Sequence, residues 1–140
     1  MKLSDEQFEA VAYIFERAHG NIKTDYENGV INKSGLSKYK PSLLEKEVIN
    51  GLNAGIYNNS IDRVSAYWVL GKRFNRNLIP AFQKWLRYEL DSNDAIAVYQ
   101  ILIALGNMDE PVFNPKRNGS YASWEAELNI EDAKDYLKHI

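Results

Sequence analysis

Apolar residues recur at helical spacing in several segments of the chain, and short polar turns separate these segments. In the first segment the recurring residues are Phe8, Val11, Ala12, Phe15 and Ala18. A spacing of three and four residues places such side chains on one face of a helix. Ser4 and Gln7 form a capping-box pattern before this run, and Gly20 is a typical stop after it. The pattern therefore predicts a helix over residues 5–19.

The same period predicts further helices along the chain. They cover residues 42–54, residues 61–74, a stripe from Leu78 to Leu90 capped by Asn77, and residues 94–105. We expect Ile61, Val64, Tyr67, Trp68 and Phe74 to share one apolar side. The helix at 94–105 is apolar on nearly every side, which is typical of a central helix. A short helix near 123–128 and a final helix that begins at Asn129, with Asp132 at its third position, complete the set.

Residues 21–40 show no helical period and contain the turn signals Asn28-Gly29 and Ser34-Gly35. Their apolar anchors are Tyr26, Val30 and Ile31. We therefore expect a packed loop here, with a short hairpin or a helical turn as alternatives within it. Loops of this length in compact domains are often functional, so the segment is also a candidate contact surface.

Two helical segments align with each other at an offset of 35 residues, and both end in Leu-Gly. They are VSAYWVLG at 64–71 and YQILIALG at 99–106. A period of this size is typical of helical-hairpin repeats, which stack to bury a shared core. The pattern resembles HEAT-like repeats, and the alternative is an ordinary bundle with two buried helices. The expected fold is thus all-α, with antiparallel helical hairpins stacked as a short HEAT-like right-handed solenoid or bundle.

Length and composition are consistent with one domain. The chain has 140 residues, of which 45% are apolar and 26% are charged. We expect a single helical domain over 1–140, with a repeat core at about 42–106 and a C-terminal capping segment at 107–140. The first residues turn acidic at once, without the apolar core of a signal peptide, and no apolar stretch approaches bilayer length. These features predict a cytoplasmic protein that makes no use of a membrane.

The sequence offers little catalytic chemistry. Cysteine is absent, and the two histidines, His19 and His139, lie near opposite ends of the chain without ligand spacing. Neither a phosphate-binding loop nor a nucleophile elbow is present. We therefore expect no enzyme activity, no catalytic residues, no cofactor and no metal.

The net charge of −2 conceals an uneven distribution. Residues 21–92 carry 11 basic against 7 acidic side chains, whereas residues 109–140 carry 7 acidic against 4 basic ones. Residues 1–20 also have an acidic excess, 4 against 2. A phosphate-contacting patch would use the basic residues Lys72, Arg73, Arg76, Lys84 and Arg87, and its alternative is a solvated hairpin end. The acidic ends favour a basic protein partner.

The C-terminal half resembles a group of small bacterial proteins. The segments that carry this resemblance are ALGNMDEPVF at 104–113, YASWE at 121–125 and NIEDAKDYL at 129–137. Their order is similar to that in all-helical immunity proteins, some of them HEAT-like, of polymorphic or contact-dependent growth inhibition toxin systems. The resemblance implies that the chain neutralises a cognate toxin C-terminal domain by binding it. It transfers no contact residue, because the binding surfaces of such proteins vary.

The leading hypothesis is therefore an immunity protein for a toxin domain, with a nuclease as the toxin. The candidate partner-binding residues are Asp109, Glu110, Tyr121, Glu125, Glu127 and Glu131. For Phe113 and Trp124 we expect a core role at the end of the last repeat. The alternative is a helical-repeat protein that binds nucleic acid, or an adaptor that binds another protein. Of the possible partners, nucleic acid is less expected than a toxin domain.

Overall fold

The computed structural model describes residues 1–140 and contains helices without any strand. This confirms the expected all-α class. The α-helices are α1 (Asp5–Ala18), α2 (Asp25–Lys33), α3 (Pro41–Asn53), α4 (Ser60–Gly71), α5 (Ile79–Asp91), α6 (Ala95–Asn107) and α7 (Ala126–Lys138). A 3-10 turn, η1 (Arg76–Leu78), precedes α5. None of these helices combines the length and the apolar character that crossing a bilayer requires.

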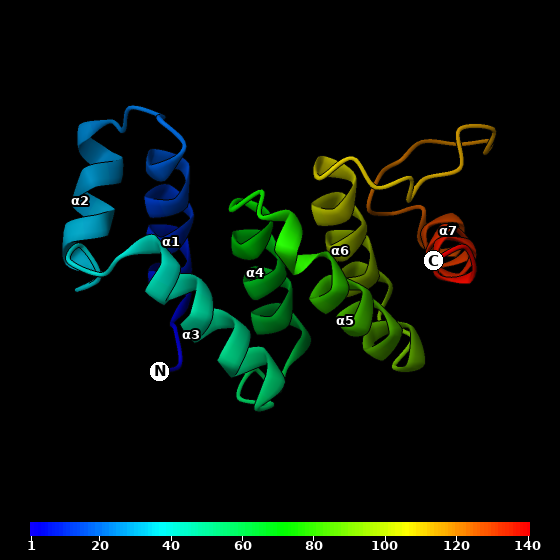
Figure 1. The fold of residues 1–140 in the computed structure, drawn as a ribbon, viewed down its shortest axis with the longest axis horizontal. Coiled ribbons are helices and arrows are strands. Elements are labelled where there is room, and N and C mark those ends of the chain that lie inside the picture. The colour runs from blue at the N-terminus through cyan, green and yellow to red at the C-terminus, as the bar shows by residue number, and fades with distance from the viewer. The chain divides into compact units, whose positions relative to one another are not determined.

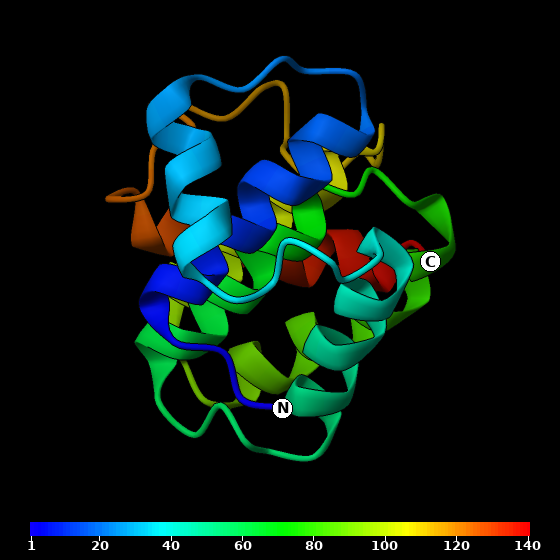
Figure 2. The same ribbon diagram turned by 90° about the vertical axis from the view of Figure 1, so that its left-hand side faces the viewer.

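The chain divides into two compact units, Met1–Arg73 and Phe74–Ile140. In the first unit, α1 packs against α2, α3 and α4 (Figures 1 and 2). Its apolar face buries Phe8, Val11 and Phe15. Tyr57 completes this core: its ring lies 5.3 Å from that of Phe8, and its hydroxyl accepts a hydrogen bond of 3.1 Å from the Leu3 amide. These contacts hold the N-terminal residues and the α3–α4 connection against α1.

In the second unit, α6 packs against both α5 and α7 (Figure 1). The completely covered side chains of α6 include Val98, Ile101, Leu102 and Leu105. One side of the helix is nevertheless solvated, because Ile96 is 53% exposed. The expectation of a helix buried on nearly every side therefore fails along the side that contains Ile96, where Tyr99, Gln100 and Ile103 are only half-buried.

Residues 21–40 contain a helix where the sequence predicts a packed loop. α2 begins with a capping box: the Thr24 hydroxyl accepts from the Glu27 amide, and the Glu27 carboxylate accepts from the Thr24 amide. Only Ile31 of the three expected anchors is buried, whereas Tyr26 is 68% exposed. The expectation failed because Asn28-Gly29 is a common turn signal. In the structure Gly29 lies within α2, and a Cβ placed on it would meet open space.

Several helix boundaries also differ from the predicted ones. α4 ends at Gly71, and Phe74, expected to be its last residue, has a left-handed backbone with φ of 50°. Asn75 caps η1 by accepting from the Asn77 amide, so Asn77 caps no helix. α7 begins at Ala126, and Asn129 is a buried residue inside it.

The predicted apolar side of α4 is only partly correct. Tyr67 is buried and Val64 is half-buried. Ile61, Trp68 and Phe74 are 74%, 37% and 49% exposed, so they do not belong to the core. Ile61 and Trp68 lie on the surface because the buried face of α4 is formed by Ala66, Tyr67, Val69 and Leu70, whereas Phe74 lies beyond the end of the helix.

The two helices of the sequence repeat are locally equivalent. Asn59 and Asp94, which are 35 positions apart, both cap their helices by accepting from the amide three residues further on. The buried positions of α4, Ala66, Tyr67, Val69 and Leu70, correspond at the same offset to Ile101, Leu102, Ala104 and Leu105 of α6. The repeat therefore marks the same cap and the same buried face in each helix.

Candidate partner-binding surfaces

A single buried arginine organises the irregular segment between α6 and α7. The Arg117 side chain is 3% exposed and forms an ion pair of 2.9 Å with the Asp132 carboxylate. The same Nη1 atom donates to the Asn129 side-chain oxygen at 2.9 Å, and Nη2 donates to the Ser120 carbonyl. A charged side chain buried to this degree is stable only when it is paired in this way. Arg117 thus fixes the segment onto α7.

Aromatic rings flank the Arg117 guanidinium. Its central carbon lies 4.7 Å from the Tyr121 ring centre and 5.4 Å from that of Phe113. The two ring centres are 5.2 Å apart, and the Tyr121 hydroxyl donates to the Asn114 carbonyl at 3.3 Å. Stacking of this kind stabilises a cation that has left water. The rings and the buried pair therefore give this segment a defined conformation without regular secondary structure.

Trp124 lies in the same fixed segment but points its ring to solvent. Its side chain is 78% exposed, whereas the sequence predicts a core role. Phe113 is half-buried, in keeping with its contact to Arg117. An exposed tryptophan on an ordered segment is typical of a protein interface, where this residue type supplies much of the binding energy. The expectation for Trp124 was wrong because a polar segment carries no periodicity that shows which side is covered.

The six predicted partner-binding residues all belong to the second unit, but they differ in accessibility. Asp109, Tyr121, Glu127 and Glu131 are exposed, and Glu110 and Glu125 are half-buried. Glu127 and Glu131 are one turn apart on α7, so they share a solvent-facing side. Asp109 and Glu110 lie at the other end of the segment, directly after α6.

Glu110 has structural partners. It accepts a hydrogen bond of 2.6 Å from the Tyr136 hydroxyl and lies 3.8 Å from an Arg76 nitrogen. Gln83 donates to the same Tyr136 oxygen at 2.8 Å. Burial, together with the hydrogen bond to Glu110, raises the pKa of Tyr136 to about 12, although the bond from Gln83 opposes this shift. Glu110 therefore joins α7 to the end of α6, and a partner would have to compete for it.

The basic residues considered for phosphate binding also have partners within the protein. Lys72 pairs with Glu16 at 3.1 Å and lies 5.2 Å from the Trp68 ring. Arg73 pairs with Glu45 at 2.9 Å. Arg76, besides its contact with Glu110, donates to the Met108 carbonyl. Lys84 and Arg87 are exposed on α5. Three of the five side chains thus take part in the fold.

Glu16 lies at the centre of an ion-pair network in the first unit. Lys23 and Lys72 approach its two carboxylate oxygens at 2.7 and 3.1 Å. Burial raises the pKa of Glu16, but the hydrogen bonds from the two lysines outweigh it and hold the value below the ordinary 4.5. Lys23 also lies 3.6 Å from Glu27 of α2, so the network connects α1, α2 and the end of α4.

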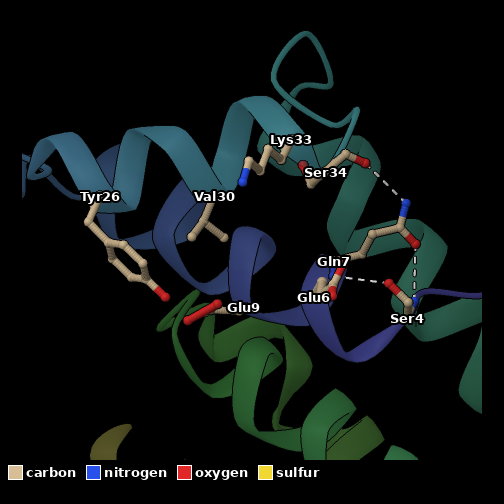
Figure 3. Close-up of a pocket in the computed structure, with 8 residues that line it drawn as sticks. All are labelled: Ser4, Glu6, Gln7, Glu9, Tyr26, Val30, Lys33 and Ser34. Carbon is tan, nitrogen blue, oxygen red and sulfur yellow. Dashed lines mark hydrogen bonds between the residues drawn. The ribbon is translucent and has the colours of Figure 1, made fainter.

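A groove of about 620 Å³ lies between α1 and α2 (Figure 3). Its lining residues are Ser4, Glu6, Gln7, Glu9, Tyr26, Val30, Lys33 and Ser34. Two of the lining residues are bonded to each other, because the Gln7 side-chain amide donates to the Ser34 carbonyl at 3.2 Å. The sequence offered two signals for it, the acidic excess of residues 1–20 and the candidate contact surface predicted at 21–40, but no pattern that placed the two segments side by side.

The histidines lie apart and contact backbone oxygens. His19 Nε2 is 2.8 Å from the Arg73 carbonyl, and His139 Nδ1 is 2.8 Å from the Asp135 carbonyl. The structure contains no group of three or more histidine, aspartate or glutamate side chains that could hold a metal ion. The features with the chemistry of binding are thus the Arg117-fixed segment and the α1–α2 groove.

No protein-family model matches the chain, and neither a curated protein nor a solved structure matches it.

Proposed function

We propose that the protein is an immunity protein that binds a basic toxin domain, a nuclease, and blocks it by occupying its surface. The observation that carries this proposal is Trp124, whose ring is 78% exposed on a segment fixed by a buried arginine. A large aromatic side chain on a preorganised backbone loses little conformational entropy on binding. Such a residue is suited to be the anchor of a tight interface.

Acidic side chains on the exposed surface of the second unit suggest the charge of the partner. Glu127 and Glu131 on the solvent side of α7 carry no ion pair, and Asp109 at the end of α6 is also exposed and unpaired. Nuclease domains carry positive clefts, and complementary charge speeds association and selects the partner. In the proposed complex, Trp124 fills a pocket on the toxin while Glu127 and Glu131 face its basic cleft.

The repeat supports a HEAT-like arrangement as part of the same proposal. α4 and α6 share a cap residue and four buried positions at an offset of 35. Repeats of this kind leave one helix face free for a partner while the other faces stack. The resemblance of residues 104–137 to immunity proteins leads to the same function.

The test is co-expression with the protein domain encoded by the gene immediately upstream, whatever its identity. We expect a stable complex, protection of cells, and a loss of at least about thirtyfold in affinity for Trp124→Ala, as for an interface hot spot. Ile96→Ala, which truncates a 53% exposed side chain on α6, is the matched control and should bind normally. A chain that neither binds this domain nor protects cells from it would contradict the proposal.

Nucleic-acid binding is less well supported, because Lys72, Arg73 and Arg76 are paired within the fold. Lys84 and Arg87 would have to provide the phosphate contacts. A steep salt dependence of binding to duplex DNA or RNA would favour this alternative over the immunity proposal.

A further inference from the structure

We propose that the groove between α1 and α2 binds an arginine side chain presented by a basic segment of a partner protein. The groove belongs to the first unit, whereas Trp124 belongs to the second. The inference therefore does not depend on the toxin proposal, and it concerns a site that no motif in the sequence marks.

The walls of the groove combine an aromatic ring with carboxylates. α1 contributes Glu6 and Glu9, and α2 contributes Tyr26, Val30 and Lys33. Figure 3 shows the Tyr26 hydroxyl directed toward the Glu9 carboxylate, with Val30 facing the space beside them. A planar guanidinium can stack on such a ring and donate to such a carboxylate at the same time.

These groups have few competing partners in the folded chain. The Tyr26 side chain is 68% exposed. Neither Glu6 nor Glu9 forms an ion pair, and the one side-chain hydrogen bond of Glu9 comes from the Tyr13 hydroxyl at 3.1 Å. The Glu9 carboxylate therefore keeps acceptor capacity, since an ionised carboxylate can accept several hydrogen bonds.

The charges around the groove favour a cation at one end of it. Glu6 and Glu9 are the two acids of the lining, and Lys33 is its one base. An incoming cation is repelled by Lys33 and attracted by the carboxylates. The Tyr26–Glu9 end is thus the preferred position, because an aromatic ring and a carboxylate lie together there.

Two basic side chains of the protein already contact a tyrosine ring and a carboxylate together. Lys23 lies 5.3 Å from the Tyr13 ring centre while pairing with Glu16 at 2.7 Å. Arg117 lies 4.7 Å from the Tyr121 ring centre while pairing with Asp132 at 2.9 Å. In both, a tyrosine face and a carboxylate hold one cation. The α1–α2 groove presents a tyrosine and carboxylates without such a cation.

The test is a titration of the isotope-labelled full chain with N-acetyl-arginine amide, followed by amide chemical shifts. N-acetyl-citrulline amide is the matched probe, because it keeps the shape of the arginine side chain and removes its charge. We expect saturable shifts at residues of α1 and α2 around Glu9, Tyr26 and Val30 with the arginine probe, and much smaller ones with citrulline.

Substitutions on the groove then locate the contact. Tyr26→Leu and Glu9→Gln should each weaken binding about three- to tenfold, in line with single exposed cation–π and charged contacts. Lys33→Gln should strengthen it about twofold, because a repulsive charge is removed. Trp124→Ala should leave it unchanged. Equal binding of citrulline, shifts elsewhere on the chain, or no shift at tens of millimolar probe would overturn the inference.

Discussion

The two proposed binding surfaces are held in place in different ways. In the first unit, Tyr26 lies on a helix, so the backbone groups beside it are satisfied by the helix itself and by the Thr24–Glu27 capping box. In the second unit, Trp124 lies on irregular chain, whose carbonyls need partners from elsewhere. Arg117 supplies one, at Ser120, and Asn129 supplies another, at Ala122. The helix is stabilised by many backbone hydrogen bonds, whereas the conformation of the C-terminal segment depends on a few hydrogen bonds from side chains.

The basic side chains near the two surfaces, Lys23 and Arg117, also differ in how many partners they have. Lys23 contacts two carboxylates, and Glu16 in turn has a second lysine, Lys72, so losing one contact leaves others. Arg117 has one carboxylate, Asp132, and its Nε atom is buried without a hydrogen-bond partner. The comparison suggests that the N-terminal surface tolerates substitution and that the C-terminal surface has a single critical residue.

The largest expected effect is therefore at Arg117. Arg117→Met removes the partner of a buried carboxylate, and breaking such a pair costs about 3–5 kcal/mol. We expect a lower urea midpoint, together with faster proteolysis of residues 113–125. Lys116→Met, at an exposed neighbouring position, is the control and should leave both measurements near those of the parent chain.

A second variant separates the loss of the pair from the loss of packing. Arg117→Met combined with Asp132→Leu leaves no unpaired charge, so stability should recover relative to the single variant. If Arg117→Met alone costs less than about 1 kcal/mol, the C-terminal segment has support beyond Arg117 and the proposed contrast fails.

Gly51 of α3 tests the packing of the first unit. A Cβ at this position would lie 2.6 Å from the Tyr57 ring, so Gly51→Ala must displace a buried side chain. Overpacking of this kind costs about 1–3 kcal/mol. Gly29→Ala in α2 is the matched change: it meets open space in a helical backbone and should stabilise by about 0.5–1 kcal/mol.

The two glycine variants are compared by urea unfolding. A stabilising Gly51→Ala would contradict the tight contact with Tyr57. A destabilising Gly29→Ala would contradict the helix at Asp25–Lys33, which the sequence did not predict.

The sequence predicted the parts of the fold that depend on local rules. The Ser4–Gln7 capping box, the repeat at an offset of 35 and the buried residues of α6 all follow from spacing and capping. The sequence did not predict α2, because Ile31 is its one fully buried residue. A single apolar position shows no helical periodicity. Tertiary packing on α1, together with the capping box, stabilises it.

The candidate surfaces could be predicted only in part, because they depend on contacts between distant residues. The acidic character of the C-terminal segment was visible, and Tyr121, Glu127 and Glu131 are accessible as expected. In the sequence Arg117 looks like an ordinary surface charge. Its role follows only from the fold, in which α7 places Asn129 and Asp132 in contact with it. Trp124 lies on the segment that Arg117 fixes, and no periodic pattern in the sequence indicates that its ring faces solvent.

Tyr136 gives the second unit a dependence of stability on alkaline pH. Its pKa is raised to about 12 from the ordinary 10.0, which means that folding favours the neutral hydroxyl. This stabilisation is complete below about pH 10 and is lost as the pH rises toward 12. Tyr136→Phe should lose about 1–2 kcal/mol at neutral pH, through its two hydrogen bonds, and should flatten the profile between pH 10 and 12. Unfolding curves measured across this range, with Tyr39→Phe as the exposed control, test this effect.

Glu16 should make the stability of the first unit depend on acidic pH, and this is the smallest of the expected effects. Its pKa is held below the ordinary 4.5 by Lys23 and Lys72 against the effect of burial, so folding favours the carboxylate. The stabilisation is present above pH 4.5 and is lost as the pH falls through the lower, folded-state value. Because the pairs are partly exposed, we expect Glu16→Gln to cost less than about 1 kcal/mol at neutral pH and low salt.

The control for this variant is Glu6→Gln, which removes an exposed carboxylate that has no ion pair. Unfolding of both variants is measured from pH 7 to pH 3 at two salt concentrations. Glu16→Gln should flatten the acid limb and reduce its salt dependence, because screening weakens the pairs that this variant lacks. A loss at neutral pH as large as that of Arg117→Met would show that the ion pairs of the first unit are not redundant. The N-terminal surface would then depend on a single residue just as the C-terminal one does.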